Sequence, residues 1–191
     1  MPKLLGIVGS PRRGGNTDWL VRKVLEGAAR EGAETELISL AGLRIAECDG
    51  CHACWRGTAC SKRDDMNSLY SKLAASDILV FGTPVYWYGP TALMKGFIDR
   101  FVYFNCPEHR PLLRGKIAAV VAPFEETDPE TVRPVLDFFA RTFQYLELKL
   151  AGELVAPGNE RKGAVLEKPD LLDAAVALGA KLGRIAGESP K

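Results

Sequence analysis

The chain has 191 residues, a formal net charge of +1 at pH 7 and 47% hydrophobic residues. This hydrophobic share excludes a disordered chain, and the length predicts a single domain over residues 1–191 with a substantial core. The balanced charge argues against nucleic acid as a main partner. No apolar run approaches the ~20 residues of a membrane-spanning helix, and the N-terminus lacks a signal-peptide pattern, so we expect no membrane association and a cytoplasmic protein.

The first predicted element is a strand, Lys3–Gly9, which is followed by a loop of glycine, hydroxyl and basic residues. Apolar residues at helical spacing predict a helix after this loop, and we expect Asn16 or Thr17 to cap it. Glu34–Leu40 is the second predicted strand. Residues 41–63 then form a long cysteine-rich loop.

Asp64 is expected to cap the next helix, whose apolar face begins at Met66. The apolar run Ile78–Phe81 is too short for a helix and predicts a buried third strand. Large aromatic residues follow it on a loop. A helix is expected to open at Pro90, in a first turn that needs no backbone N–H, and to reach about Phe104.

Lys116–Ala122 is the fourth predicted strand and Leu148–Val155 the fifth. The helix between them either begins near Pro134 or kinks there, because proline disrupts a helix interior. A last helix is predicted from apolar residues at helical spacing between Leu171 and Ile185.

Five strands that alternate with helices predict a parallel α/β sandwich. In such folds ligands bind at the carboxyl ends of the strands, where the strand order reverses. In the order 2-1-3-4-5, the ends of the first and third strands are neighbours at this point. We therefore expect the loops that follow these two strands to form one site.

The loop after the first strand has the composition of an anion site. Ser10, Asn16 and Thr17 offer neutral donors and Arg12 a charged one, beside a helix N-terminus whose backbone N–H groups attract anions. This set suits a phosphate monoester, although neither a Walker loop nor a G-x-G-x-x-G fingerprint is present. A glycine-rich surface turn with a capped helix is the alternative interpretation.

The loop after the third strand contains Pro84, Val85, Tyr86, Trp87 and Tyr88. Exposed aromatic rings are costly unless something flat packs on them, so the loop suits a planar cofactor, with a core plug or an oligomer contact as equal alternatives. One loop for a phosphate and one for a ring together predict FMN. We assign no catalytic side chain, because a flavin carries the chemistry itself.

Four cysteines follow the pattern C-x2-C-x2-C-x5-C inside the loop 41–63: Cys48, Cys51, Cys54 and Cys60. Three cysteines spaced three apart can wrap one cubane and a fourth can complete it, which favours a [4Fe–4S] cluster. Free or redox-active thiols are an alternative. Zinc is another, although its cysteine pairs usually have a longer spacer between them.

Three stretches together resemble the NADPH-dependent FMN reductase family, and within it the iron–sulfur flavoprotein branch. These stretches are GSPRRGGNT after the first strand, the cysteine loop running into Asp64-Asp65-Met66, and GTPVYWYGPTALMKGFIDR. The resemblance covers about residues 3–125. It implies a flavodoxin-like three-layer sandwich with a five-stranded parallel sheet.

The resemblance also implies residue roles. Four residues would hold the FMN phosphate: Ser10, Arg12, Asn16 and Thr17. Five would line the isoalloxazine ring: Pro84, Val85, Tyr86, Trp87 and Tyr88. The loop Pro123–Thr127 would close the other side of the ring, and the cysteines of the branch would bind [4Fe–4S].

We therefore expect an FMN-dependent oxidoreductase, similar to iron–sulfur flavoproteins. It would pass electrons between NADH, NADPH or a reduced carrier and an acceptor such as ferredoxin, a quinone or free flavin. A cluster-free NAD(P)H-dependent FMN or quinone reductase is the alternative enzyme. A non-enzymatic redox or zinc sensor is the alternative outside catalysis.

The helix from Pro90 has two neighbouring apolar stripes, which together are wider than contact with the sheet requires. The first stripe packs on the sheet, and the second is formed by Met94, Ile98 and Val102. Together with the family resemblance it predicts a homo-oligomer, a dimer or a tetramer. Burial of this helix beneath the C-terminal elements is the alternative.

Overall fold

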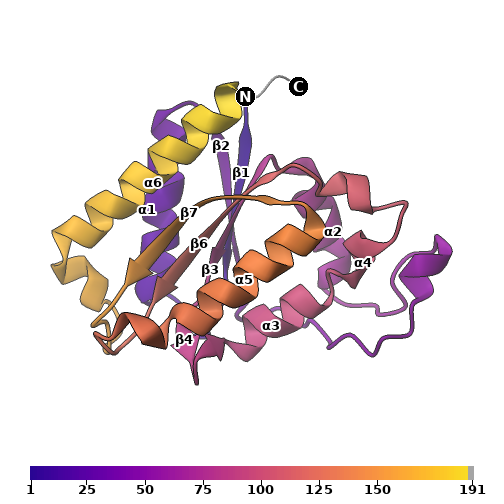
Figure 1. Ribbon diagram of the computed structural model, residues 1–191, viewed down its shortest axis with the longest axis horizontal. Helices are drawn as coiled ribbons and strands as arrows, with labels where there is room; N and C mark the ends of the chain where they lie inside the picture. Colours follow the sequence, from indigo (N-terminus) through magenta and orange to yellow (C-terminus); the bar gives the residue numbers. More distant parts are fainter. Residues whose placement is uncertain (189–191) are drawn as a thin grey trace.

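A five-stranded parallel sheet lies at the centre of the computed structural model, which describes residues 1–188 (Figure 1). The strands of this sheet are β1 (Lys3–Val8), β2 (Glu34–Ser39), β3 (Ile78–Gly82), β6 (Ile117–Pro123) and β7 (Lys149–Ala156). They lie in the order β2-β1-β3-β6-β7. Two further strands, β4 (Val85–Tyr86) and β5 (Gly89–Pro90), form a separate antiparallel ribbon. The order of the five sheet strands is the predicted one, whereas the ribbon was not predicted and shifts the numbering.

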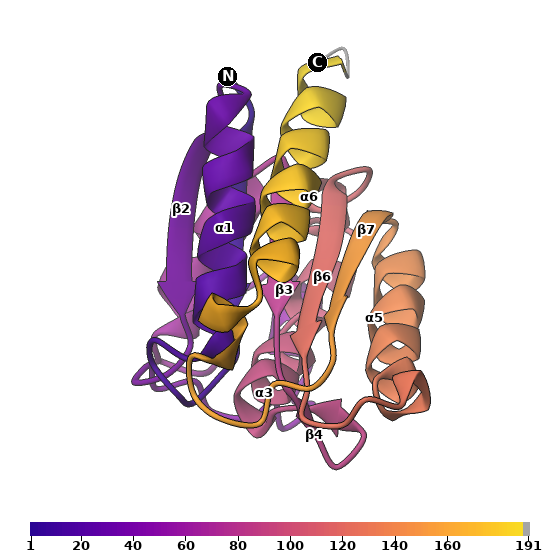
Figure 2. The same cartoon turned by 90° about the vertical axis from the view of Figure 1, so that its left-hand side faces the viewer.

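Helices cover both faces of the sheet. They are α1 (Asn16–Arg30), α2 (Met66–Ala75), α3 (Ala92–Asp99), α4 (Val102–Asn105), α5 (Arg133–Leu146) and α6 (Pro169–Glu188). Figure 2 shows α1 and α6 side by side on one face, with α3 and α5 on the other. No helix within residues 1–188 combines the length and the apolar character that crossing a bilayer requires.

Two hydrophobic cores form because successive strand residues point to opposite faces. In β3, Ile78 and Val80 join the core beneath α1 and α6, whereas Leu79 and Phe81 join the core beneath α2, α3 and α5. The central strands are buried on both sides, which explains their nearly continuous apolar sequences.

Helices α1 and α6 approach each other at backbone distance. A methyl group added at Gly27 of α1 would lie 2.0 Å from the carbonyl oxygen of Val176, and one added at Gly179 of α6 would lie 1.9 Å from that of Val24. Only glycine allows this contact, because no Cβ atom fits at such distances. This pair fixes where α6 lies against the sheet and therefore where the chain segment before it runs.

Several predicted helix boundaries are wrong. The N-cap of α1 is Gly15, and Asn16 and Thr17 lie inside the helix, where they do not cap it. The N-cap of α2 is Asp65, although Asp64 Oδ1 accepts a hydrogen bond from the first N–H group of the helix. The helix α1 thus begins one residue earlier than expected and has no side-chain cap, whereas the side chain of Asp64 accepts from α2 as expected although the N-cap is one residue later.

The predicted helix from Pro90 to about Phe104 is two helices. Pro90 is not in a helix but pairs with Val85 in the ribbon, and α3 starts after Thr91, whose side chain accepts a backbone N–H of the helix. The helix is interrupted after α3 at Arg100 and Phe101, before α4 begins. By contrast, α5 begins next to Pro134 as predicted, with the proline in its first turn.

The second apolar stripe is largely satisfied within the chain. Met94 and Ile98 are buried in the core, and Val102 is half-buried. The stripe alone therefore does not require a partner subunit.

Candidate functional site

The loops after β1 and β3 meet, as predicted. Val8 is the register partner of Gly82, and the Gly9 N–H donates to the carbonyl oxygen of Gly82 at 2.7 Å. Thr91 Oγ1 donates to the carbonyl oxygen of Gly9 at 2.5 Å. A side chain at Gly9 is excluded, since its Cβ would lie 2.7 Å from the Cβ of Met94. The first loop is thus held tightly against the start of α3.

A pocket opens at this edge of the sheet. It is lined by residues from four segments: Ser10, Arg12, Asn16 and Thr17 after β1; Pro84, Val85 and Tyr86 in the ribbon; Pro123, Phe124 and Glu125 after β6; and Asn159, Glu160 and Lys162 after β7. All four predicted phosphate residues and three of the five predicted ring residues line one pocket. The residues after β7 were not predicted to take part.

An open helix N-terminus faces the loop after β1. The N-cap Gly15 offers no side-chain hydrogen bond to α1, so the first N–H groups of the helix are left for other partners. The hydroxyls of Ser10 and Thr17 are buried beside them. Ser10 Oγ accepts from the Arg12 N–H at 3.2 Å, which leaves its own O–H free to donate. These donors and the guanidinium of Arg12 form a site that suits an anion.

The side chain of Asn16, which also lines the pocket, makes three hydrogen bonds within the chain. Its Nδ2 donates to the carbonyl oxygens of Asn159 and Arg161, both at 3.0 Å. Its Oδ1 accepts from the Val165 N–H at 3.4 Å. The side chain therefore connects α1 to the segment after β7.

The aromatic residues of the ribbon divide into two groups. Tyr86 lines the pocket, whereas Trp87 and Tyr88 form the tip of the ribbon and do not. Trp87 is 97% exposed. The backbone of both tip residues adopts the left-handed conformation, with φ angles of 49° and 60°. Asparagine and glycine are the usual residues in such a turn. Such a conformation costs roughly 1–2 kcal/mol per bulky residue, so the tip stores strain next to the pocket.

The four motif cysteines are free but not gathered into one set. Cys54 is buried, Cys48 and Cys60 are half-buried, and Cys51 is exposed with its Sγ 3.1 Å from Ser61 Oγ. Within residues 1–188, no three His, Cys, Asp or Glu side chains are grouped so that they could hold a metal ion.

The surroundings of Cys54 act on its protonation. Burial raises the pKa of the Cys54 thiol, and Cys60, Cys106 and Cys48 raise it further through their charge. The donor chemistry suits iron–sulfur ligation, whereas the arrangement of the loop does not collect the ligands.

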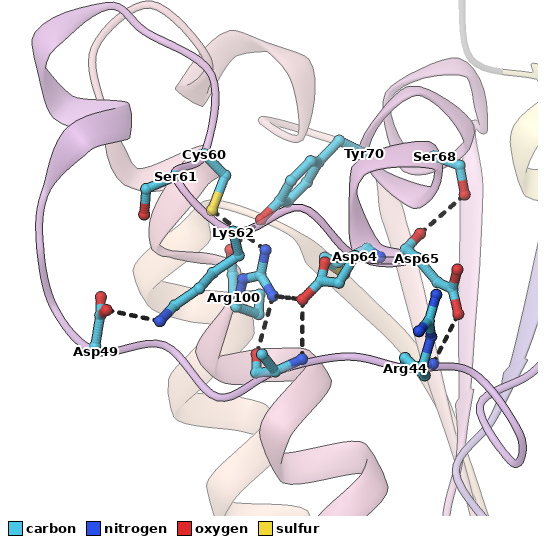
Figure 3. A network of polar contacts seen from close by, with 12 residues as sticks. Arg44, Asp49, Cys60, Ser61, Lys62, Asp64, Asp65, Ser68, Tyr70 and Arg100 are labelled. Carbon is cyan, nitrogen blue, oxygen red and sulfur yellow. Dashed lines mark hydrogen bonds and ion pairs between the residues drawn. The ribbon is translucent and has the colours of Figure 1, made fainter.

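A buried ion pair holds the two ends of the cysteine loop together (Figure 3). The guanidinium of Arg100, 1% exposed, donates to Asp64 Oδ2 at 2.6 Å and to the carbonyl oxygen of Ala46 at 2.9 Å. Asp64 also accepts from the Ala46 N–H at 2.9 Å. Arg100 Nη2 donates to Cys60 Sγ at 3.2 Å, which connects the ion pair to the motif.

The protonation of this cluster follows from its contacts. Burial raises the pKa of Asp64, but hydrogen bonds from Arg100 and the Ala46 N–H outweigh it and hold the pKa below its ordinary value. Burial is the main reason why the pKa of the adjacent Tyr70 phenol is raised. Sequence reasoning missed Arg100, because an arginine directly after Asp99 and one turn from Lys95 reads as part of a charged, exposed helix end.

The cysteine loop and the pocket are separate places in the fold. No residue of 41–63 lines the pocket. Figure 1 places this loop beside α2 and α4, away from β4. A hydrogen bond connects the loop after β1 with the start of the cysteine loop: Arg13 donates to the carbonyl oxygen of Ala41 at 2.8 Å.

Comparison with known proteins agrees with the fold and identifies a family. The family described as NADPH-dependent FMN reductase matches residues 2–125. An iron–sulfur flavoprotein of Methanocaldococcus jannaschii is 40% identical over 125 residues, which cover 63% of this chain and 61% of the relative. This chain thus spans less than two thirds of that relative's length.

Two further proteins match over almost the whole chain. A Bacillus subtilis protein named as an NAD(P)H-dependent FMN-containing oxidoreductase is 28% identical over 180 residues, 92% of this chain and 96% of the relative. A solved structure of a flavone reductase superposes with a TM-score of 0.76 at 23% identity, covering 97% of this chain and 63% of that one. The structural likeness establishes the flavodoxin-like fold.

Proposed function

Because the chain belongs to the NADPH-dependent FMN reductase family, we propose that it is an FMN-dependent oxidoreductase that takes electrons from NADH or NADPH. The observation that carries this proposal is the pocket, in which an open helix N-terminus with two buried hydroxyls lies beside an aromatic ribbon. Bound FMN supplies hydride acceptance and electron release in ones or twos. We propose a single FMN-binding domain over residues 1–191, working in the cytoplasm.

The residues of the pocket would bind and orient the cofactor. The hydroxyls of Ser10 and Thr17, the guanidinium of Arg12 and the Asn16 N–H would hold the phosphate. Pro84, Val85 and Tyr86 would contact the ring, and Trp87 and Tyr88 at the tip of the ribbon would line it from the solvent side. No side chain is needed as an acid or base, since flavin protons exchange with solvent.

For the cysteine loop we propose a [4Fe–4S] cluster held by Cys48, Cys51, Cys54 and Cys60. Their spacing, their free thiols and the name of the 40% identical relative support this proposal. A cluster would supply a one-electron capacity between the flavin and a carrier such as ferredoxin. The second candidate is a cluster-free reductase of quinones or free flavin. It is favoured by the scattered arrangement of the thiols in residues 1–188.

Anaerobic purification tests both candidates. We expect one FMN per chain and, for the cluster, about four iron and four sulfide per chain. Turnover of NADH and NADPH is then measured with ferredoxin, a quinone and free flavin as acceptors. A wild-type chain that binds no FMN would overturn the proposed function, and metal without flavin would favour a sensor.

Sedimentation at micromolar protein tests the predicted homo-oligomer.

A further inference from the structure

The segment after β7 contributes one wall of the pocket, although it lies outside the matched residues 2–125. Figure 2 shows this segment passing below the sheet, from the end of β7 to the lower end of α1. Several hydrogen bonds hold it there, among them one from Arg12 Nη1 to the carbonyl oxygen of Glu160 at 3.4 Å. The Asn159 N–H donates to the carbonyl oxygen of Phe124 at 2.8 Å, and the Gly158 N–H to that of Glu126 at 2.9 Å. The two bonds from Asn16 complete the attachment.

The side chain of Asn159 is buried, 5% exposed, and its orientation is determined by its partners. Its Nδ2 donates to the carbonyl oxygens of Ala156 and Pro157, both at 2.9 Å. Since carbonyl oxygens only accept, the amide nitrogen must be the atom on that side. Asn159 Oδ1 consequently has no hydrogen-bond partner among the described residues.

A buried acceptor without a donor is unfavourable, and such atoms usually have a partner that is a water or a ligand. Asn159 lies at the anion end of the pocket, because its own carbonyl oxygen accepts from Asn16 at the start of α1. A fully ionised phosphate has no proton to donate to it. The expected partner is therefore a hydroxyl adjacent to the phosphate.

The same segment also carries a cation. Lys162 lines the pocket, and its Nζ would lie 4.0 Å from a Cβ atom placed at Gly14. No carboxylate of residues 1–188 forms an ion pair with Lys162 in the structure. Its charge is therefore available to an anion held by the loop after β1.

We propose that the segment after β7 binds the ribityl phosphate chain of FMN. Asn159 Oδ1 accepts a hydrogen bond from a ribityl hydroxyl, and Lys162 pairs with the phosphate. This inference rests on the proposed function and extends it. It assigns recognition of the sugar-like chain to residues that neither the predicted loops nor the matched family region contain.

Three flavins separate these contacts in a titration of the full chain, followed by quenching of flavin fluorescence. FMN has the ribityl chain and the phosphate, riboflavin has only the chain, and lumiflavin has neither. We expect Asn159→Ala to weaken FMN and riboflavin about tenfold and to leave lumiflavin unchanged. We expect Lys162→Gln to weaken FMN about tenfold and to leave riboflavin unchanged. Lys149→Gln, an exposed lysine at the start of β7, is the matched control and should change nothing.

The alternative is that Asn159 only holds the segment in place. In that case Asn159→Ala would weaken all three flavins equally, and the proposal would be overturned. Equal binding of FMN by Asn159→Ala and wild type would overturn it as well, while the proposed function would stand. The 2′-, 3′- and 4′-deoxy analogues of FMN test the same contact without a mutation. We expect wild type to bind at least one of these analogues about tenfold more weakly than FMN. We expect Asn159→Ala to bind that same analogue and FMN equally well.

Discussion

The hydroxyl of Thr91 donates a 2.5 Å hydrogen bond to the carbonyl oxygen of Gly9 and so joins α3 to the loop after β1. The same oxygen atom of Thr91 accepts from the Met94 N–H at 3.2 Å. The Thr91 N–H donates to Thr83 Oγ1 at 3.1 Å. Thr91, a buried residue, therefore connects the loop after β1, the segment before the aromatic ribbon and α3. The two halves of the pocket are expected to respond together when this residue changes.

Thr91→Val removes the hydroxyl at nearly constant shape and leaves the Gly9 carbonyl and the Met94 N–H without this partner. We expect the free energy of unfolding to fall by about 1–3 kcal/mol and FMN to bind more weakly. Urea unfolding and flavin titration measure the two effects. Thr142→Val is the control, because that hydroxyl bonds only to Phe138 within α5. Equal losses in both variants would show that the Thr91 bond has no special role.

Thr17 offers a test of the anion site alone. Thr17→Val removes the donor and keeps the methyl group, which lies close to Gly82. Because the lost bond would be to a charged phosphate, we expect FMN affinity to fall by about 1–3 kcal/mol. Ser10→Ala is expected to act in the same direction. Thr17→Ser keeps the hydroxyl and should bind FMN nearly as wild type does, and equal binding by the Val and Ser variants would contradict the proposed contact.

The five sheet strands could be predicted to within one residue at each end. The central strands are continuous apolar runs of strand length, and the two edge strands β2 and β7 follow from the alternation of strands with helices. The loops after β1 and β3 could be predicted as one site for the same reason, since a parallel sheet places their ends side by side. Composition alone picked out Ser10, Arg12, Asn16 and Thr17, which line one pocket, and their contact with a phosphate stays a prediction. These predictions depend on local sequence and on topology, and the structure confirms the topology.

The start of the helix after the ribbon could not be predicted, because Pro90 suits a first helical turn and an edge strand equally well. The deciding contact is Thr91 with Gly9, which are 82 positions apart. The left-handed backbone of Trp87 and Tyr88 could not be predicted either, because bulky residues rarely adopt this conformation. Asn159 reaches the site through Asn16, 143 positions away, so no local pattern could reveal it.

Gly27→Ala tests the backbone contact between α1 and α6. The added methyl group would lie 2.0 Å from the Val176 carbonyl oxygen, so the helices must separate. We expect a loss of about 1–3 kcal/mol of folding free energy, measured by urea unfolding. Gly96→Ala in α3 is the matched control, since nothing lies within 4 Å of its added methyl group. It should be neutral or stabilising by up to about 1 kcal/mol. Similar effects of both substitutions would refute the close contact.

Asp64 makes stability depend on pH in a defined direction. Its pKa in the folded protein is lowered, so its contribution is fully present above its unfolded pKa of about 3.9 and is lost as the pH falls through the folded pKa. We expect the free energy of unfolding of wild type to decline more steeply below about pH 4 than that of Asp64→Asn. At neutral pH the variant should lose about 3–5 kcal/mol, because Arg100 stays buried without its counter-ion.

The control for this titration is Asp137→Asn, which changes an exposed carboxylate of α5. It should keep the acid slope of wild type and lose little stability at pH 7. If the free energy of unfolding falls equally steeply in wild type and Asp64→Asn between pH 4 and pH 2, protonation of Asp64 does not contribute to the loss of stability in acid.

Cys51→Ala tests whether the cysteine motif holds a cluster apart from the flavin. Under anoxia we expect the variant to lose its iron and acid-labile sulfide, because one ligand of the proposed cluster is missing. We expect it to keep its flavin, since no residue of the cysteine loop lines the pocket. Iron, sulfide and flavin absorbance are measured on the same sample. Cys106→Ala, a cysteine outside the motif, should retain the iron.

Each departure from this result has a distinct meaning. Joint loss of flavin and iron would show that the two sites depend on each other, although Arg13 with Ala41 is the contact that links their loops. Retention of iron by Cys51→Ala would remove Cys51 from the ligands and agree with its exposed position beside Ser61. Wild type that lacks iron even under strict anoxia would exclude the cluster. The bond from Arg100 to Cys60 would then hold a free thiol in a reductase that works through its flavin alone.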